Sequence, residues 1–413
     1  MNKTESSGTS LMCVFRSLPF FSVWAVMVGS VVSAADSAGS VSYHGDVSRL
    51  MQKHCIQCHR NDGVAPFSLE SFEEVEANAP MIQEVIRRGT MPPWYAAEVS
   101  DGQRSPWANE RVLTISEKET LAAWIRAGRP EGNAEDAPEP LEFSAGWQID
   151  ADSIYEAPAV HVKATGVMPY EYILIDTKES QDRWIDGIEI RPSAPQAVHH
   201  VLAFVVPPGQ DPRKVNGINY WGVYAPGSGA QVYPEGYARK LPKDSKILLS
   251  MHYTPTGEAV VDRTQIAVRR ASKAPEFEVR TTSVANTDFT IPAGAENYEI
   301  TAKVRWPRDV RVLGYLPHSH LRGTAARYEV VSRSGDSELL LDVPRYDFNW
   351  QLFYRYREPR TVPAGSTVKY TAWYDNSENN PANPDPTQDV EWGDQTFEEM
   401  HLGYVEFVVP RNP

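Results

Sequence analysis

The pattern of apolar residues changes once along this chain, and that change limits the folds open to it. Residues 40–130 place apolar side chains at the three- and four-residue spacing of α-helices. From about residue 146 onward, the chain consists of short runs rich in β-branched and aromatic residues, separated by Pro, Gly, Asn and Asp. We therefore expect a multidomain protein in which a small all-α domain precedes a larger all-β region.

The β region is too long for one sandwich of ordinary size. We expect two antiparallel jelly-roll sandwiches, in residues 146–280 and 281–413. The boundary is placed between 270 and 290, because the stretches 271–276 and 290–295 lack a strand pattern. The strongest strand predictions are EYILIDT (171–177), AVHHVLAFVV (197–206), KILLSMHY (246–253), RVLGYL (311–316), ARYEVV (326–331), ELLLDV (338–343), STVKYTAWY (366–374) and GYVEFVV (403–409), with a hairpin turn at Ser334–Ser337.

Two further segments have compositions of their own. Residues 131–145 are rich in Pro, Glu and Asp and are expected to form a linker. Residues 1–34 have the form of a signal peptide, with Lys3 and Arg16 before an apolar run that ends in small residues. The run is shorter than the roughly 20 apolar residues of a membrane span, although an uncleaved anchor is the alternative. The signal predicts a periplasmic or secreted protein, for which membrane contact is not expected after cleavage.

The net charge limits the kinds of partner that the protein is expected to bind. The chain carries a formal net charge of −14, which argues against nucleic acid and anionic membranes as partners. Cys13 falls in the predicted signal, so the exported chain keeps only Cys55 and Cys58. Because these two lie three residues apart, no long-range disulfide is available, and the fold must rest on its apolar cores.

The sequence Cys55-Ile56-Gln57-Cys58-His59 is the covalent attachment motif of haem c. Two thiols form thioethers with the haem vinyl groups, and the following His binds the iron. Met91, in the segment RGTMPPW, is the best candidate for the second iron ligand, since a thioether raises the reduction potential and suits electron transfer. Met51 and Met81 are weaker candidates because both fit an apolar helical pattern. A dithiol redox motif or a plain disulfide is the alternative.

The stretch from Tyr43 to Pro130 resembles a small bacterial cytochrome c. The resemblance includes a terminal helix containing LAAWIRAG (121–128), which we expect to begin with a capping box at Ser116–Glu119 and to stop at Gly128. It implies a cytochrome c domain in residues 40–130 that carries electrons.

Six metal-capable side chains follow in the β region. They are His199, His200, His252, His318, His320 and Met400. Imidazoles joined by a thioether favour copper, Cu(I) in particular, over zinc or magnesium. Any one of these residues alone is more often part of the core or the surface; the ordered series is the stronger signal.

The spacing of the ligands predicts local geometry. His318 and His320 flank one residue, so on a strand both side chains share a face, with α-carbons about 6.6 Å apart. His199 and His200 are adjacent, and a regular strand would send them to opposite faces. Joint binding of one ion by this pair therefore requires a bulge, a twist or different ring nitrogens. His252 ends a strong strand pattern and is expected to lie across the sheet from the pair.

The order HH…H…HxH…M resembles the copper type II, ascorbate-dependent monooxygenases, which include peptidylglycine α-hydroxylating monooxygenase and dopamine β-monooxygenase. The resemblance implies two copper ions and two jelly-roll subdomains over roughly residues 150–413. It gives His199, His200 and His252 to an electron-relay copper, and His318, His320 and Met400 to the copper that binds dioxygen.

The chain also departs from that family. The animal members contain several disulfides, and none is available here. Leu316 stands where the peptide-amidating members have an Arg that grips the substrate carboxylate, and Leu402 stands where they have an Asn. Tyr404 is retained. The resemblance therefore implies a hydroxylase other than a peptide-amidating enzyme, with a more apolar pocket that Tyr346 and the segment 348–351 could line.

The expected function is hydroxylation of a C–H bond in a small organic or peptide substrate by dioxygen, with electrons delivered through the cytochrome from an unidentified donor. Two alternatives stay open. One is a non-catalytic electron-transfer or copper-binding protein. The other is a carbohydrate or peptide binding module in which the histidines are incidental.

Overall fold

The computed structural model describes residues 41–413 except 62, 99–103, 144–145 and 412–413. Residues 41–413 form one compact unit. The predicted export signal, residues 1–34, lies outside the described residues. Among the described residues, no helix is both long enough and apolar enough to cross a membrane.

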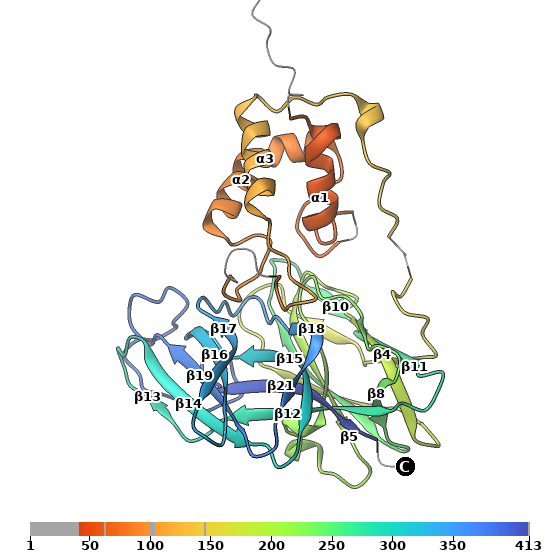
Figure 1. Ribbon diagram of the computed structural model, residues 1–413, viewed down its shortest axis with the longest axis vertical. Helices are drawn as coiled ribbons and strands as arrows, with labels where there is room; N and C mark the ends of the chain where they lie inside the picture. The colour runs from red at the N-terminus through yellow and green to blue at the C-terminus, as the bar shows by residue number, and fades with distance from the viewer. Residues whose placement is uncertain (1–40, 62, 99–103, 144–145, 412–413) are drawn as a thin grey trace, which may run out of the picture. The chain divides into compact units, whose positions relative to one another are not determined.

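Helices dominate the first part of this unit, as the apolar spacing predicted (Figure 1). They pack around a core of their own that includes Val47, Met51, Leu121 and Trp124. The helical elements are the π-helical turn η1 (Tyr43–Val47), α1 (Ser48–His54), α2 (Phe72–Arg88), α3 (Ile115–Arg126) and the short 3-10 turn η2 (Ala134–Asp136).

The last helix begins before the predicted capping box. The side chain of Thr114 accepts a hydrogen bond from the backbone N of Glu117, and the Glu117 carboxylate accepts one from the backbone N of Thr114. Glu117 is thus the third residue of the helix and not its first, and α3 starts at Ile115 instead of after Ser116. The prediction at Ser116 was wrong because Thr114 offers the same hydroxyl two residues earlier.

The predicted β-sandwich architecture is confirmed. One nine-stranded sheet has the order β1-β11-β4-β8-β12-β21-β15-β18, with β7 also paired to β4, and two four-stranded sheets have the orders β3-β9-β5-β6 and β14-β19-β16-β17. The first half of the chain supplies β1 (Ser153–Glu156), β2 (Val160–Val162), β3 (Glu171–Asp176), β4 (Arg183–Arg191), β5 (Val198–Val206), β6 (Tyr220–Tyr224), β7 (Gln231–Val232), β8 (Tyr237–Leu241), β9 (Lys246–Tyr253), β10 (Val260–Asp262) and β11 (Gln265–Arg270), with 3-10 turns η3 (Pro212–Lys214) and η4 (Gly217–Asn219). The second half supplies β12 (Phe277–Ala285), β13 (Thr290–Ile291), β14 (Tyr298–Arg305), β15 (Val310–His318), β16 (Gly323–Val331), β17 (Ser337–Val343), β18 (Tyr354–Val362), β19 (Thr367–Tyr374), β20 (Val390–Glu391) and β21 (Leu402–Pro410).

Each four-stranded sheet packs face to face against one half of the nine-stranded sheet. Each of these packed pairs forms one sandwich. The first core joins residues such as Val201 and Leu249 of the short sheet to Ile188 and Val268 of the long one. A second core joins β14, β16, β17 and β19 to β12, β15, β18 and β21. The long sheet is therefore common to both sandwiches.

The two sandwiches are joined through β12. This strand pairs in parallel with β8, through Phe277 opposite Tyr237, and antiparallel with β21 along its whole length. It spans residues 277–285 and so runs across the boundary expected between 280 and 281. The flanking stretch 271–276, which lacked a strand pattern, is the connection that leads into it.

A small apolar cluster fills the contact between the sandwiches. On β5, Val201 and Ala203 point into the first core, whereas Leu202 and Phe204 belong to this contact cluster. Leu248, Leu316 and Tyr404 come to the same cluster from β9, β15 and β21. Because side chains alternate along a strand, every second residue of these four strands faces the neighbouring sandwich.

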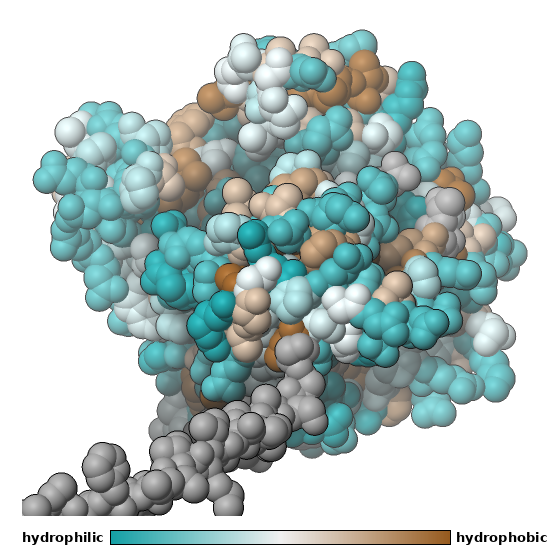
Figure 2. All heavy atoms as spheres, turned by 90° about the horizontal axis from the view of Figure 1, so that it is seen from above, coloured by the Kyte–Doolittle hydropathy of each residue, from teal (hydrophilic) through white to brown (hydrophobic). Residues whose placement is uncertain are grey.

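The segment between α2 and α3 packs on the second sandwich. Trp94 and Trp107 join its core and contact Tyr354, and Trp107 stacks on Tyr356 with ring centroids 4.8 Å apart. The face drawn in Figure 2 is mostly hydrophilic, with scattered apolar patches. Single exposed apolar residues are ordinary for a globular surface.

Candidate metal centre and haem attachment segment

The first three histidines come together on the short sheet of the first sandwich. His200 on β5 lies directly opposite His252 on β9 in the strand register. The ring centroid of His252 is 4.9 Å from that of His199 and 4.9 Å from that of His200. One possible ligand atom from each of the three residues lies within 4.8 Å of the others. The group could therefore hold a single metal ion.

The pair His199–His200 shares this site because the strand is irregular there. The pairing of β5 with β9 shifts register between Val198 and His200, so His199 does not occupy a regular strand position. The sequence required such a departure, and the structure confirms it. A bulge re-aims a side chain without ending the strand, and here it turns His199 toward the face that already carries His200 and His252.

The ring nitrogens of this group face one another. His199 Nδ1 and His200 Nδ1 are 3.0 Å apart. Two nitrogens bound tetrahedrally to one ion at about 2.0 Å lie roughly 3.3 Å apart. His252 Nδ1 is buried and has no hydrogen-bond partner among the described residues. A buried nitrogen without a partner is costly, and a metal ion would satisfy it.

Burial disfavours the charged form of these rings and lowers the pKa of each. Burial, with His199 and His318 nearby, lowers the pKa of His252 to about 3. Burial and the surrounding imidazoles likewise hold the pKa of His200 well below its usual value. Neutral imidazole is the form that binds a metal, so the group needs no deprotonation before binding.

The second pair lies at the end of β15. His318 is the last residue of the strand, and His320 follows two residues later, with ring centroids 5.4 Å apart. The Nδ1 of His318 lies 2.9 Å from Gln351 Oε1, and that of His320 lies 3.1 Å from the carbonyl oxygen of Glu398. Each acceptor favours the proton on Nδ1, which leaves Nε2 available to a metal ion. His320 Nε2 is buried and has no hydrogen-bond partner among the described residues.

Met400 is held beside this pair by the sheet register. His318 pairs with Leu402, so Met400 precedes β21 on the side of His320. The buried carboxylate of Glu399 accepts hydrogen bonds from the backbone nitrogens of His320, Met400 and Arg322. Burial raises the pKa of Glu399 to about 7 despite these donors. Glu399 thus ties the ligand-bearing backbones together.

The two groups meet in one cluster. The ring centroids of His200 and His318 are 6.1 Å apart. Tyr170, which precedes β3, stacks on His252 at 4.8 Å and lies 6.3 Å from His320. Phe348 stacks on His199 at 5.0 Å and lies 6.2 Å from His320. One aromatic ring from each sandwich therefore contacts both groups.

Sequence reasoning missed Tyr170 and Glu399. The hydroxyl of Tyr170 lies 3.1 Å from His200 Nε2, and its ring covers His252. No local pattern marks this residue, because its partners lie far along the chain. Gln351 and Phe348 fall in the segment expected to line a substrate cleft, and the structure places both against the histidines.

Loss of the Tyr170 hydroxyl is expected to weaken metal binding at the first group. Tyr170→Phe keeps the ring on His252 but removes the partner of His200 Nε2. Outer-shell partners of a ligating His are worth about 10–100-fold in metal affinity, and we expect a loss in that range. Copper titration against a competing chelator measures it. Tyr172→Phe, two residues away on an exposed side chain, is the matched control, and equal affinities in both variants would contradict the assigned role.

The segment predicted to attach haem follows α1. Cys55 is the C-cap residue of that helix, and neither Cys55 nor Cys58 is in a disulfide. His59 Nδ1 lies 3.2 Å from the carbonyl oxygen of Phe67, which leaves Nε2 for an iron ligand bond. Burial, with Cys58 beside it, raises the pKa of the Cys55 thiol to about 12. Reactive dithiol pairs commonly have a lowered thiol pKa, which is the opposite direction from that of Cys55.

Met91 lies on the loop after α2. It lines a cavity together with Ile86, Trp94 and Lys118. The residues around that cavity do not include Cys55, Cys58 or His59. The role of Met91 as second iron ligand therefore stays a prediction.

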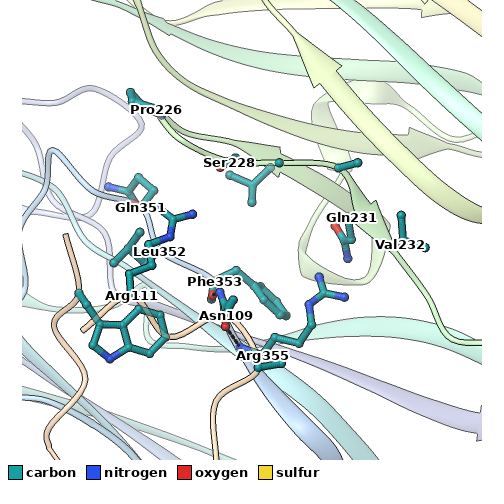
Figure 3. A pocket seen from close by; sticks show the side chains of 15 residues that line it. Asn109, Arg111, Pro226, Ser228, Gln231, Val232, Gln351, Leu352, Phe353 and Arg355 are labelled. Carbon is teal, nitrogen blue, oxygen red and sulfur yellow. Dashed lines mark hydrogen bonds between the residues drawn. The ribbon is translucent and has the colours of Figure 1, made fainter. Parts of the chain in front are cut away.

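Cys58 contacts the first sandwich. A methyl group on Gly227, in the loop after β6, would lie 2.9 Å from Cys58 Sγ. Arg111 donates a hydrogen bond of 2.9 Å to the carbonyl oxygen of Gly227. Arg111 and Gln351 also line a cavity of about 330 Å³, across which Gln231 lies (Figure 3). This cavity extends from the neighbourhood of Cys58 to the side chain that holds His318.

Comparisons with known proteins do not assign the chain to a family. No protein-family model and no curated protein matches the chain. Among solved structures, the major capsid protein P2 from bacteriophage PM2 matches 62% of this chain and 98% of its own, with 9% identity and a TM-score of 0.26. The infectious bursal disease virus Gt strain matches 64% and 75%, with 9% identity and a TM-score of 0.18. Allantoicase matches 52% and 79%, with 12% identity and a TM-score of 0.16. These similarities are too weak to indicate a shared function.

Proposed function

We propose that this chain is a haem- and copper-dependent monooxygenase that hydroxylates a C–H bond of a small organic or peptide substrate with dioxygen. The observation that carries the proposal is the cluster of five imidazoles, in which His199 is half-buried and the other four are buried, close in the sheet register to Met400. Its donors suit copper, because nitrogen and thioether ligands favour that metal and no carboxylate oxygen takes part as a ligand. Haem c and two copper ions are the proposed cofactors, and the site resembles the copper type II monooxygenases in its ligand order.

The residues have separate proposed roles. His199, His200 and His252 would hold the copper that relays electrons, whereas His318, His320 and Met400 would hold the copper that binds dioxygen. Copper, when bound, supplies one-electron redox chemistry and activation of dioxygen. The chain itself excludes water, since His200, His318 and His320 are at most 2% exposed. Gln351 and Glu398 hold the Nδ1 protons of the second pair and so orient both rings.

The helical region would serve as the cytochrome c domain, with haem held by Cys55, Cys58, His59 and Met91. Its contact with the first sandwich supports a route for electrons. Gly227 lies against Cys58 three residues after β6 ends. In β6, Tyr224 pairs with Val201 of β5, which directly follows His200. The attachment cysteine is thus one strand away from the relay ligands.

Adding a side chain where Gly227 contacts Cys58 is expected to slow electron transfer from the haem to the copper. Gly227→Ala adds a methyl group 2.9 Å from Cys58 Sγ and strains a backbone at φ +78°. We expect slower reoxidation of reduced haem by the oxidised copper, followed by stopped-flow absorbance of the haem. Gly209→Ala controls for the backbone strain, because Gly209 has φ +79° and no neighbour within 4 Å. Equal rates in the two variants would remove Gly227 from the route.

The cavity next to Gln351 supports the proposal that the protein binds a substrate. Arg111 and Arg355 line it with Trp94 and Phe353, and no carboxylate does. Leu316, which stands where the peptide-amidating relatives have an Arg, is fully buried in the contact between the sandwiches. A carboxylate grip from that position is therefore not available to a substrate.

Oxygen incorporation tests the proposal. The full chain, loaded with haem and copper and supplied with a reductant, is incubated with cell extract under ¹⁸O-labelled dioxygen. Mass spectrometry should detect a product that carries one labelled oxygen atom and is absent without copper. Consumption of dioxygen with no labelled product would contradict monooxygenase activity.

Two aromatic side chains cover the histidines of the first group, and this favours a second function. Phe348 stacks on His199, and Tyr170 stacks on His252, so both faces of the first group are occupied by protein. Such closure suits a non-catalytic electron-transfer or copper-binding protein. That function predicts haem–copper electron exchange without any substrate-dependent consumption of dioxygen.

A further inference from the structure

We propose that the two histidine groups form one binuclear metal centre, not two mononuclear sites separated by a solvent-filled cleft. This inference rests on the proposed function in that it requires metal at both groups. It adds the nuclearity of the site, which neither the ligand order nor the spacing of the histidines in the sequence contains.

The distances between rings carry the inference. His200 belongs to the first group and His318 to the second, yet their ring centroids are only 6.1 Å apart. Within the groups, the corresponding distances are 4.9 to 5.4 Å. The distance between the groups thus exceeds the distances within them by only about 1 Å. Two-metal sites hold their ions about 3.5–4 Å apart, and we infer that rings this close allow ligands of both groups to reach such a pair of ions.

The space between the groups is filled by protein. Tyr170 lies within 6.3 Å of His200, His252 and His320, measured between ring centroids. Phe348 lies within 6.2 Å of His199 and His320 on the same measure. These two rings therefore occupy part of the space between the groups. The apolar cluster of Leu202, Phe204, Leu316 and Tyr404 continues the contact away from the site.

The geometry of β5 and β15 explains why His200 and His318 lie close together. His200 shares its face of β5 with Leu202, and His318 shares its face of β15 with Leu316. Both leucines lie in the cluster between the sandwiches. Since residues two apart on a strand point the same way, the packing that buries the leucines also brings the two histidines together. The nine-stranded sheet, which both sandwiches share, holds that packing in place.

Magnetic coupling between the ions tests the inference directly. The full chain is loaded with Cu(II), its copper and haem contents are measured, and frozen samples are studied by electron paramagnetic resonance and copper X-ray absorption. We expect two coppers per chain, a Cu(II) signal well below the spin concentration that the copper content predicts, and a copper–copper scattering contribution. Two coppers with the full signal of isolated Cu(II) would overturn the binuclear centre and leave the proposed function intact. A chain that binds no copper would overturn both.

Variants that lose the copper from one histidine group make the test more specific. His318→Ala should leave copper only at the first group, and its isolated Cu(II) signal should then match the copper content. His161→Ala is the matched control, because His161 is an exposed residue of β2 outside the cluster; coupling should persist in it. If His318→Ala lowered the copper content without restoring the isolated signal, the coupling partner would lie elsewhere and the proposal would fail.

Discussion

Replacing His320 with Ala is expected to abolish oxygen-dependent product formation. The Nδ1 of His320 is held by Glu398 O, and its buried Nε2 has no partner other than the proposed copper. Loss of a direct ligand should exceed the 10–100-fold effect of losing an outer-shell partner. Product formed per unit time, the haem spectrum and copper content are measured together. The haem should be retained, and the copper content should fall.

Met400→Ala provides the companion test at the same site. Met400 supplies the only thioether of the proposed ligand set, and its backbone is fixed by Glu399 and Tyr374. We expect a loss of turnover comparable to that in the His320 variant, with the protein still folded by circular dichroism. Full oxygen-dependent turnover in Met400→Ala would show that the assignment of the second group is wrong.

The largest effect on stability is expected at a buried ion pair in the shared sheet. Arg239 on β8 and Glu406 on β21 lie 2.5 Å apart, with side chains 4% and 0% exposed. Arg239 also donates to Tyr233 Oη and Thr281 Oγ1. Although burial disfavours the charged guanidinium, Tyr233 and Glu406 raise the pKa of Arg239 above its usual value. Arg239→Met should cost about 3–5 kcal/mol in the free energy of unfolding, because it leaves the Glu406 carboxylate buried without its counter-ion.

The double variant Arg239→Met, Glu406→Leu separates the loss of the pair from the burial of a lone charge. Replacing a whole buried ion pair with apolar residues is often neutral, so the double variant should recover most of the stability lost in the single one. Denaturant unfolding of the two variants and the parent chain gives the comparison. A single variant that loses less than about 1 kcal/mol, the scale of an exposed pair, would contradict this role.

Local pattern was enough to predict most of the strands near the site. The runs 171–177 and 246–253 correspond to β3 and β9, and the hairpin turn appears at Gly335, where φ is +97°. A departure from a regular strand at His199 also followed from sequence, which left a bulge, a twist or different ring nitrogens open, and the structure shows a register shift there. These features depend on neighbouring residues alone.

Features that depend on distant residues were not predictable in this way. The parallel pairing of β8 with β12 joins the sandwiches into one sheet, and no periodicity in either strand signals it. The approach of His200 to His318 follows from that junction and from the apolar contact cluster. Tyr170 contacts His200 from a distant part of the chain, and Glu399, although it adjoins Met400, also accepts from the distant backbone of His320, so no local motif shows these contacts.

The metal and haem content of the purified full chain tests the central claim most directly. Copper is counted by mass spectrometry of the digested protein, and covalent haem by its absorbance after extraction of free haem. The account predicts one covalently bound haem and two coppers per chain, with copper uptake lost when His200 and His318 are both replaced by Ala. A chain with no covalent haem, or with clearly fewer than two coppers, would contradict it.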